Sequence, residues 1–331
     1  MIQRTRAYPR VGLIGNPSDG YFGKTISFVI RNFAAQVTLY ESPELCIEPH
    51  HKDHSVFSSI QELVDDVYYS GYYGGIRLIK ATIKRFYEYT RAHHLELPAR
   101  NFTIRYDTTI PLRVGLAGSS GIITATLRAL MQFYGVTIEK QLQPSLILSV
   151  ERDELGISAG LQDRVIQVYE GVVFMDFRRD HMEEHGFGIY EDLDPALLPP
   201  LFVAFQENLS EGTEVFHNDV RQRWDMGDPE VREAMEQFAR CAEQFRHAML
   251  TGDRERMFHL INQNFDIRAG FYPISEQNWR LVNTARNIGA CAKFCGSGGA
   301  VVGIYDGPRM LDELERAYSS VGARLITPQI V

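Results

Sequence analysis

Hydrophobic residues of this chain either alternate with polar ones or run together over short segments, a pattern typical of β-strands. Such segments lie within residues 7–20 and at 24–30, 36–40, 101–106, 171–177, 201–205, 300–305 and 323–327. Elsewhere, hydrophobic residues recur three or four positions apart, as on one face of a helix. These predicted helices cover residues 58–69, 75–93, 145–155, 213–224, 229–251, 254–268, 275–288 and 310–320. The mixture is irregular and lacks the regular strand-helix alternation of a doubly wound sheet.

Residues 111–121 are the most informative stretch and predict a strand, a glycine turn and a helix that continues to residue 130. Ser119 and Ser120 stand where N-cap residues are expected. Free amides at a helix start bind anions, so a phosphate chain is the simplest ligand for this turn. A serine hydroxyl there can also bind Mg²⁺. The alternative is an ordinary capped turn, because isolated glycine-serine patterns are common.

Asp163 is the first candidate for a catalytic group, because it lies between a glycine turn and a predicted helix. A carboxylate beside a hydroxyl nucleophile can accept or orient its proton during phosphoryl transfer. Arg10 could stabilise this carboxylate and the charge that develops on the phosphoryl group. A capping aspartate and a surface arginine are the alternative interpretation.

Glu151 could complete an oxygen shell for Mg²⁺ together with Ser119 or Ser120, although a solvated helix face explains it equally well. Asp19 lies in a polar loop where it could accept hydrogen bonds from sugar hydroxyls. Several basic residues are candidates for an acidic group on a substrate, and most of them must be plain surface charge. They are Lys24, Arg113, Arg221, Arg223 and Arg268.

Two further segments have open interpretations. His50, His51 and His54 could suggest a metal site, but no partner motif supports one, and a solvated loop is favoured. The tyrosine-glycine segment at residues 68–75 fits a pocket for a flat ring or a tight turn between helices.

The composition of the chain favours some classes of protein and argues against others. The 331 residues are 44% hydrophobic and 23% charged, an ordinary globular balance. A net charge of −8 argues against nucleic acid as the main partner. The four cysteines show no zinc spacing, and neither a signal peptide nor a bilayer-spanning run is evident, so we expect a cytoplasmic protein with reduced thiols. Prolines near residues 192–200 predict a boundary between domains at 1–195 and 196–331.

Three glycine-containing segments occur in an order that resembles the galactokinase, homoserine kinase, mevalonate kinase and phosphomevalonate kinase (GHMP) superfamily. These are the first motif at residues 9–19, the second motif at 111–121 and the third motif at 293–300. Within the superfamily, the chain looks most like the glucuronokinases. The matching segments are residues 15–23, 71–75, 159–164, 220–224 and 295–302, spread over nearly the whole chain.

The resemblance implies an α+β fold with a ribosomal-protein-like N-terminal domain and a ferredoxin-like C-terminal domain. ATP phosphates would lie on Gly115, Leu116, Ala117, Gly118, Ser119, Ser120 and Gly121. By the same resemblance, Ser119 or Ser120 and Glu151 would hold Mg²⁺, Asp163 would act as base and Arg10 would assist it. The substrate would contact Asp19, Lys24, Gly296, Ser297, Gly298 and Gly299. Lys24 stands where the resembled kinases often carry arginine.

The expected activity is transfer of the γ-phosphoryl group of ATP to the anomeric hydroxyl of a sugar, with D-glucuronate as the first choice. A kinase for galactose, fucose or a heptose phosphate is one alternative, and a catalytically silent sugar or nucleotide sensor is another. The expected partner is a small sugar or sugar acid, with no nucleic acid and no membrane. The chain is expected to be a monomer or a homodimer.

Overall fold

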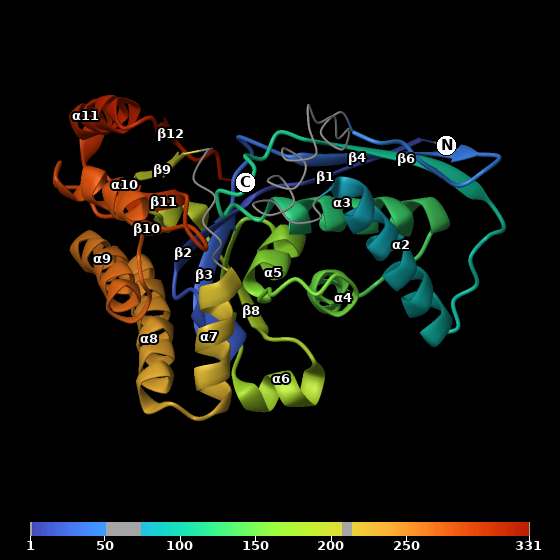
Figure 1. Ribbon diagram of the computed structural model, residues 1–331, viewed down its shortest axis with the longest axis horizontal. Coiled ribbons are helices and arrows are strands. Elements are labelled where there is room, and N and C mark those ends of the chain that lie inside the picture. The colour runs from blue at the N-terminus through green and yellow to red at the C-terminus, as the bar shows by residue number, and fades with distance from the viewer. Residues whose placement is uncertain (1, 51–73, 207–213, 331) are drawn as a thin grey trace, which may run out of the picture.

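The computed structural model describes residues 2–50, 74–206 and 214–330 and contains both helices and sheets (Figure 1). The predicted helix at 58–69, most of the tyrosine-glycine segment, His51 and His54 lie outside these ranges. The α+β class predicted from the sequence is confirmed. Each of the three sheets in the described residues has four strands.

The first sheet has the strand order β1-β4-β6-β5. Its strands are β1 (Ile2–Ala7), β4 (Ala35–Ser42), β6 (Asn101–Thr108) and the short β5 (Cys46–Ile47). Helix α3 (Gly118–Tyr134) packs on β1 and β4, and α2 (Gly75–Ala92) packs on α3 (Figure 1). Alternate residues are buried in β4 and, from Ile104 onward, in β6, as expected for strands covered by helices on one face.

The second sheet carries the residues that matter for function. Its order is β2-β3-β7-β8, and all its neighbours are antiparallel. The strands are β2 (Arg10–Ile14), β3 (Lys24–Val29), β7 (Val172–Asp176) and β8 (Ile189–Leu193). Helix α5 (Gln162–Tyr169) and helix α8 (Pro229–Thr251) both pack against β2 and β3, which explains why every residue of β2 is buried.

Short elements connect these parts. The turn η1 (Ser18–Tyr21) follows β2, and α4 (Gln143–Ser149) continues as a π-helical segment, η3 (Val150–Glu154). Helix α6 (Arg179–His185) lies between β7 and β8, and the turn η4 (Pro195–Leu197) follows β8. π-Helical turns often occur at functional sites.

The third sheet belongs to the C-terminal part of the chain, with the order β10-β11-β9-β12. Its strands are β9 (Leu201–Phe205), β10 (Lys293–Phe294), β11 (Ala300–Ile304) and β12 (Arg324–Ile326). The remaining helices described are α7 (Glu214–Asp225), α9 (Arg254–Phe271), α10 (Glu276–Arg286) and α11 (Gly307–Ser320). The strand predicted at 201–205 and the helix predicted at 229–251 are confirmed with the same bounds.

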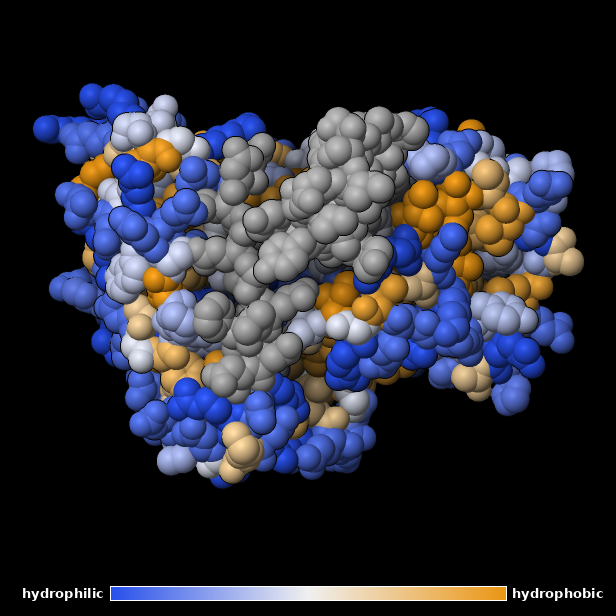
Figure 2. All heavy atoms as spheres, in the orientation of Figure 1, coloured by the Kyte–Doolittle hydropathy of each residue, from blue (hydrophilic) through white to orange (hydrophobic). Residues whose placement is uncertain are grey.

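One hydrophobic cluster runs through all three sheets. It contains Ile14 of β2, Leu39 of β4, Phe205 of β9 and Phe245 of α8, each of them fully buried. This continuous core fixes the sheets relative to one another, while the domain boundary at residue 195 stays a prediction. Figure 2 shows hydrophilic residues around much of the rim of one face, with hydrophobic residues in smaller patches among them. No helix in the described ranges combines the length and the hydrophobicity needed to cross a membrane.

The structure corrects the prediction in three places. Residues 111–114 are not a strand but an irregular turn, because Pro111 has no amide to donate and Arg113 adopts a positive φ of 58°. Helix α6 and the partly exposed edge strand β8 were not predicted, because their hydrophobic pattern is weak. His50 is buried and contacts Asp107 at 3.0 Å, so the predicted solvated loop is wrong at this residue.

Candidate active site

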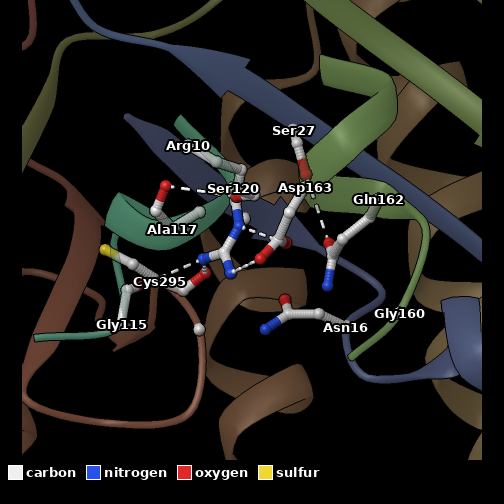
Figure 3. Close-up of polar contacts among 12 residues, drawn as sticks. Arg10, Asn16, Ser27, Gly115, Ala117, Ser120, Gly160, Gln162, Asp163 and Cys295 are labelled. Carbon is white, nitrogen blue, oxygen red and sulfur yellow. Dashed lines mark hydrogen bonds and ion pairs between the residues drawn. The ribbon is translucent and has the colours of Figure 1, made fainter. Parts of the chain in front are cut away.

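Arg10 at the start of β2 forms an ion pair with Asp163 in the first turn of α5 (Figure 3). Its Nε donates to Oδ1 at 2.7 Å and its Nη2 donates to Oδ2 at 2.9 Å. Two parallel hydrogen bonds fix both the position and the plane of a carboxylate. Nη1 of the same guanidinium donates to the carbonyl oxygens of Gly115 at 2.9 Å and of Cys295 at 2.5 Å. Arg10 therefore joins α5 to the second and third motifs.

The charge state of Asp163 follows from these contacts. Burial alone would raise the pKa of this carboxyl, but the positive charges of Arg10 and Arg164 outweigh burial and lower its pKa below the ordinary value. The carboxylate is consequently ionised at neutral pH. Its side chain keeps 15% of its surface exposed, so it is not sealed from a ligand.

Glu151 forms a second buried ion pair, with Arg164. Arg164 Nε donates to Glu151 Oε2 at 2.8 Å, and Nη2 also contacts that oxygen. The other oxygen, Oε1, accepts a hydrogen bond from Ser119 Oγ at 2.7 Å. The π-helical segment η3 positions Glu151, and α3 positions Ser119. The structure thus brings together two of the three predicted metal-binding residues.

The second motif ends at the N-terminus of α3, which no side chain caps in the part of the chain that is described. The N-cap is Ala117, in a left-handed conformation, so the prediction that Ser119 and Ser120 are N-cap residues is wrong. The helix begins two residues earlier than capping by Ser119 would require. Ser120 Oγ donates back to Ala117 O at 3.2 Å. The first helical hydrogen bond runs from Gly121 N to Ala117 O at 3.2 Å. The earlier amides, Gly118 to Ser120, have no acceptor among the described residues and are available to an anion.

Glycine is required where the second and third motifs touch. A Cβ on Gly115 would lie 2.8 Å from the carbonyl oxygen of Gly298. A Cβ on Gly296 would lie 2.5 Å from the carbonyl oxygen of Gly115 and 2.7 Å from Arg10 Nη1. The two loops therefore pack backbone against backbone, which a side chain at either position would prevent.

Arg268 of α9 holds the third motif. Its Nη1 donates to Gly296 O and its Nη2 to Ser297 O, both at 3.0 Å. Asn278 Oδ1 accepts the amide of Gly299 at 3.0 Å. Arg268 was a candidate for an acidic group on a substrate, but both terminal nitrogens of its buried side chain are directed at backbone carbonyls instead.

Asp19 in η1 lies next to the start of α5. Its Oδ2 accepts the amide of Gln162 at 3.2 Å, and its Oδ1 accepts Gln162 Nε2 at 3.1 Å. Burial, reinforced by the nearby charge of Asp163, raises the pKa of Asp19 to about 7. The two carboxylates Asp19 and Asp163 thus have separated pKa values, a feature often found at functional sites.

Three of the other basic candidates pair with acidic side chains, and the fourth is Arg113. Lys24 Nζ donates to Glu243 at 2.9 Å and lies 3.8 Å from Asp176. Arg221 and Arg223 pair with acidic residues near the end of α7, Asp225 and Asp228 respectively. Arg113 lies in the turn before α3.

Sequence reasoning missed three residues of this region. Arg164 follows Asp163 directly, but nothing in the sequence indicates that it is buried. Lys293 is 1% exposed and donates to Gly12 O, Asn16 Oδ1 and Phe294 O at 2.8, 2.7 and 2.6 Å. Burial lowers the pKa of Lys293 to about 7. The third missed residue, Asn16, belongs to the first motif, and that membership was the only available signal.

The arrangement suits transfer of an anionic group to a hydroxyl. An ionised carboxylate, a guanidinium and an uncapped helix start meet in one place, while Ser119 and Glu151 offer neighbouring oxygens to a cation. The described residues contain no cluster of three or more histidine, cysteine or acidic side chains of the kind that holds a metal unaided. Mg²⁺ does not need one, because it usually binds one or two carboxylates together with phosphates and water.

Comparison with known proteins agrees with this interpretation of the site. The family model described as GHMP kinases N terminal domain matches residues 77–171. The chain is 44% identical over 327 residues to Glucuronokinase 1 of Arabidopsis thaliana, covering 97% of this chain and 90% of that protein. It is 46% identical over 318 residues to Probable glucuronokinase 2 of the same plant, covering 94% and 86% respectively.

A solved structure has the same fold at low identity. The galactokinase of Lactococcus lactis complexed with galactose superimposes with a TM-score of 0.79 at 15% identity. The superposition covers 99% of this chain and 93% of that one.

Proposed function

Because the chain belongs to the GHMP kinases, and within them to the glucuronokinases, we propose that it transfers the γ-phosphoryl group of ATP to D-glucuronate. The acceptor is the anomeric hydroxyl, and the product is D-glucuronate 1-phosphate. The observation that carries the proposal is the Arg10–Asp163 pair, with an ionised and partly exposed carboxylate beside the uncapped start of α3.

The second motif is the proposed site for the phosphates of ATP. The amides of Gly118, Ser119 and Ser120 would donate to phosphate oxygens, with the dipole of α3 behind them. Gly115, Leu116, Ala117 and Gly121 shape the loop rather than bind through side chains. Gly115 packs closely against the third motif, which holds this loop in place and supports binding of the phosphates by its backbone.

Ser119 and Glu151 would hold Mg²⁺, and their oxygens fit a small hard cation. Ser119 Oγ and Glu151 Oε1 are 2.7 Å apart, and Oε1 is the oxygen that Arg164 leaves available. When bound, Mg²⁺ neutralises charge on the transferred phosphoryl group. Ser120 is less suited, because its hydroxyl is buried and bonded to Ala117 O.

Asp163 is the proposed base. Its carboxylate would accept a hydrogen bond from the anomeric hydroxyl, and the proton would pass to it as that oxygen bonds to phosphorus and the bond to the leaving phosphate breaks. A lowered pKa makes Asp163 a weak base, so orienting the hydroxyl is its main contribution. Arg10 keeps this carboxylate ionised and in place.

The sugar would lie between the first and third motifs. Asp19 would accept hydrogen bonds from its hydroxyls, and the amides of Gly296, Ser297 and Gly298 would border it, with Gly299 fixing the turn. Lys24 stays a weaker candidate, because Glu243 already binds its amine.

The test is release of ADP by the purified full chain with Mg²⁺ and ATP, measured over a panel of uronic acids and neutral sugars. We expect D-glucuronate to give the highest kcat/KM, and phosphorus NMR to show an anomeric phosphate. A preference for a neutral sugar would transfer the proposal to another substrate. ADP release that no sugar stimulates would contradict it.

A further inference from the structure

Lys293 and Asn16 make a buried contact that the proposed mechanism does not use. Lys293 begins β10, and Asn16 follows β2; both are almost fully buried. An ammonium has three N–H donors and no acceptor. Those three donors meet three oxygens, those of Gly12, Phe294 and the Asn16 side chain.

This contact fixes the orientation of the Asn16 amide. Lys293 Nζ donates to Oδ1 at 2.7 Å, and the protonated amine, which cannot accept a hydrogen bond, keeps Nδ2 turned away from it. The backbone oxygen of Asn16 accepts Asn264 Nδ2 at 3.4 Å, which holds the residue from a second side. Within the described residues, Nδ2 itself has no acceptor, and it is not among the side-chain atoms buried there without a partner. Asn16 as a whole is 2% exposed, so only a narrow opening leads to this donor.

The Asn16 amide lies on the face of β2 that also carries Arg10, the partner of the proposed base. Asn16 Cγ is 3.3 Å from the place that a Cβ of Gly12 would occupy, so it covers that face of β2. Gly12 is paired with Ser27 of β3, whose Oγ donates to Gln162 Oε1 at 3.2 Å, and Gln162 precedes Asp163. Residues paired across antiparallel strands share one face of the sheet. Figure 3 draws Asn16 below Arg10 and Asp163, with no dashed line joining it to either of them.

The charges around this donor favour an anionic acceptor. Lys293 withdraws electron density from the amide oxygen, which strengthens Nδ2 as a donor. Arg10 and Arg268 add positive charge near Lys293. Asp19 and Asp163, by contrast, are acceptors suited to hydroxyls. A sugar that carries both hydroxyls and a carboxylate matches this division of acceptors and donors.

We propose that Asn16 is a specificity-determining residue whose Nδ2 donates to the carboxylate of the sugar acid, and that Lys293 is the positioning residue that fixes the amide in this orientation. The proposal rests on the proposed function. It assigns selection between acidic and neutral sugars to an amide held by a buried cation, rather than to an exposed arginine or lysine.

The first experiment is Asn16→Asp in the full chain. This variant keeps the size of the side chain and gives Lys293 an ionic partner, but it replaces the outward donor with an oxygen that repels a carboxylate. We expect the KM for D-glucuronate to rise by roughly 30-fold or more, since like charges placed together are strongly unfavourable. The KM for ATP should stay within about twofold, as an effect confined to the sugar requires.

The matched control is Asn262→Asp on α9. Asn262 Oδ1 accepts the amide of Ala292 at 3.3 Å, so an aspartate there keeps the acceptor and adds the same charge near Lys293. We expect its KM for D-glucuronate to be close to that of the unchanged chain. An equal rise in both variants would mean a general effect of charge and would overturn the proposal.

Lys24→Met separates this inference from its main competitor. A rise in the KM for D-glucuronate in Lys24→Met, with no rise in Asn16→Asp, would overturn the proposal and assign the carboxylate to Lys24. We expect the reverse.

The role of Lys293 is tested by a double-mutant cycle. Lys293→Met frees the amide to rotate, so the KM for D-glucuronate should rise, and adding Asn16→Asp should raise it by less than in the unchanged background. Fully additive effects would show that Lys293 does not act through Asn16. Should Lys293→Met fail to fold, Lys293→Gln, which retains two of the three donors, takes its place in the cycle.

Failure of this inference differs from failure of the proposed function. If the unchanged chain prefers D-glucuronate and Asn16→Asp keeps that preference, only the role of Asn16 is wrong. If the unchanged chain shows no preference for an acid, the proposed substrate is wrong.

Discussion

Two buried ion pairs meet at the start of α5, and they use their carboxylates in different ways. Arg10 binds both oxygens of Asp163, one with each of two nitrogens. Arg164 directs two nitrogens at a single oxygen of Glu151, and the second oxygen goes to Ser119. Arg164 Nη1 also lies 3.4 Å from Asp163, so the two pairs are electrostatically linked.

The difference separates two chemical tasks. A carboxylate that accepts a hydrogen bond at each oxygen is held ionised and in one plane. Asp163 still exposes 15% of its side chain, where a substrate can contact it. The Glu151 side chain is only 1% exposed and directs Oε1 at Ser119, so a cation bound there would contact both oxygens. The first pair therefore suits the orientation of a hydroxyl, and the second suits the binding of a cation.

Asp163→Asn should have the largest effect, because it removes the negative charge of the first ion pair and keeps the shape of the side chain. We expect kcat to fall by about 10²–10⁴-fold, the usual contribution of a positioned acid or base. The dissociation constant for ATP, measured by calorimetry, should change little. Asp176→Asn, which removes another buried aspartate paired with an arginine, is the control and should keep most of its turnover. Near-normal kcat in Asp163→Asn would exclude Asp163 as base.

Arg10→Met tests the same ion pair by removing the guanidinium that binds Asp163. We expect kcat to fall by about 10²–10³-fold, as for the loss of a preorganised charge. Without the guanidinium, the pKa of Asp163 should rise, so the acidic limb of the pH profile of kcat/KM should move to higher pH. The pair also stabilises the fold above the ordinary pKa of aspartate, and this stabilisation is lost as pH falls. Because this loss occurs only below the ordinary pKa of aspartate, urea unfolding at pH 7 and at about pH 2 should differ less in Arg10→Met than in the unchanged chain.

Glu151→Gln should affect the second pair and leave the first in place. The neutral amide is a poorer ligand, so the Mg²⁺ concentration for half-maximal rate should rise by about 10–100-fold. Titration with Mg²⁺ at saturating ATP and sugar measures the shift. An unchanged Mg²⁺ requirement would mean that Glu151 serves only Arg164.

The smallest effect should distinguish Ser119 from Ser120, the two hydroxyls that sequence reasoning left open. Ser119→Ala should raise the Mg²⁺ requirement by roughly threefold to tenfold, about the value of one hydrogen bond. Ser120→Ala should raise it less, because that hydroxyl already bonds to Ala117 O. The reverse order would move the cation to Ser120.

The sequence alone predicted some residues of the two ion pairs and missed others. Ser119, Glu151 and Asp163 lie in or near glycine turns, which are local patterns in the sequence. Arg10 was proposed as the cation beside Asp163, and the resemblance of the first motif implied the same role. Arg164 was missed, although it holds Glu151, because burial depends on the packing of distant elements. Lys293 and Asn16 are 277 residues apart in the chain, and no local pattern connects them.

The secondary structure was also predicted correctly in some segments and wrongly in others. The helix at 229–251 has strong periodicity and was predicted with its exact bounds. The strand expected before the second motif does not exist, because Pro111 and the positive φ of Arg113 favour a turn. The α+β class followed from the irregular order of elements and from the family resemblance, and it holds.

The guanidinium of Arg10 contacts partners 105, 153 and 285 residues further along the chain. During synthesis, residue 10 leaves the ribosome long before Cys295 does, so the nascent N-terminal part carries this charge without its last carbonyl partner. A chain that stalls before the third motif cannot complete its reactive centre, however well its earlier strands have formed.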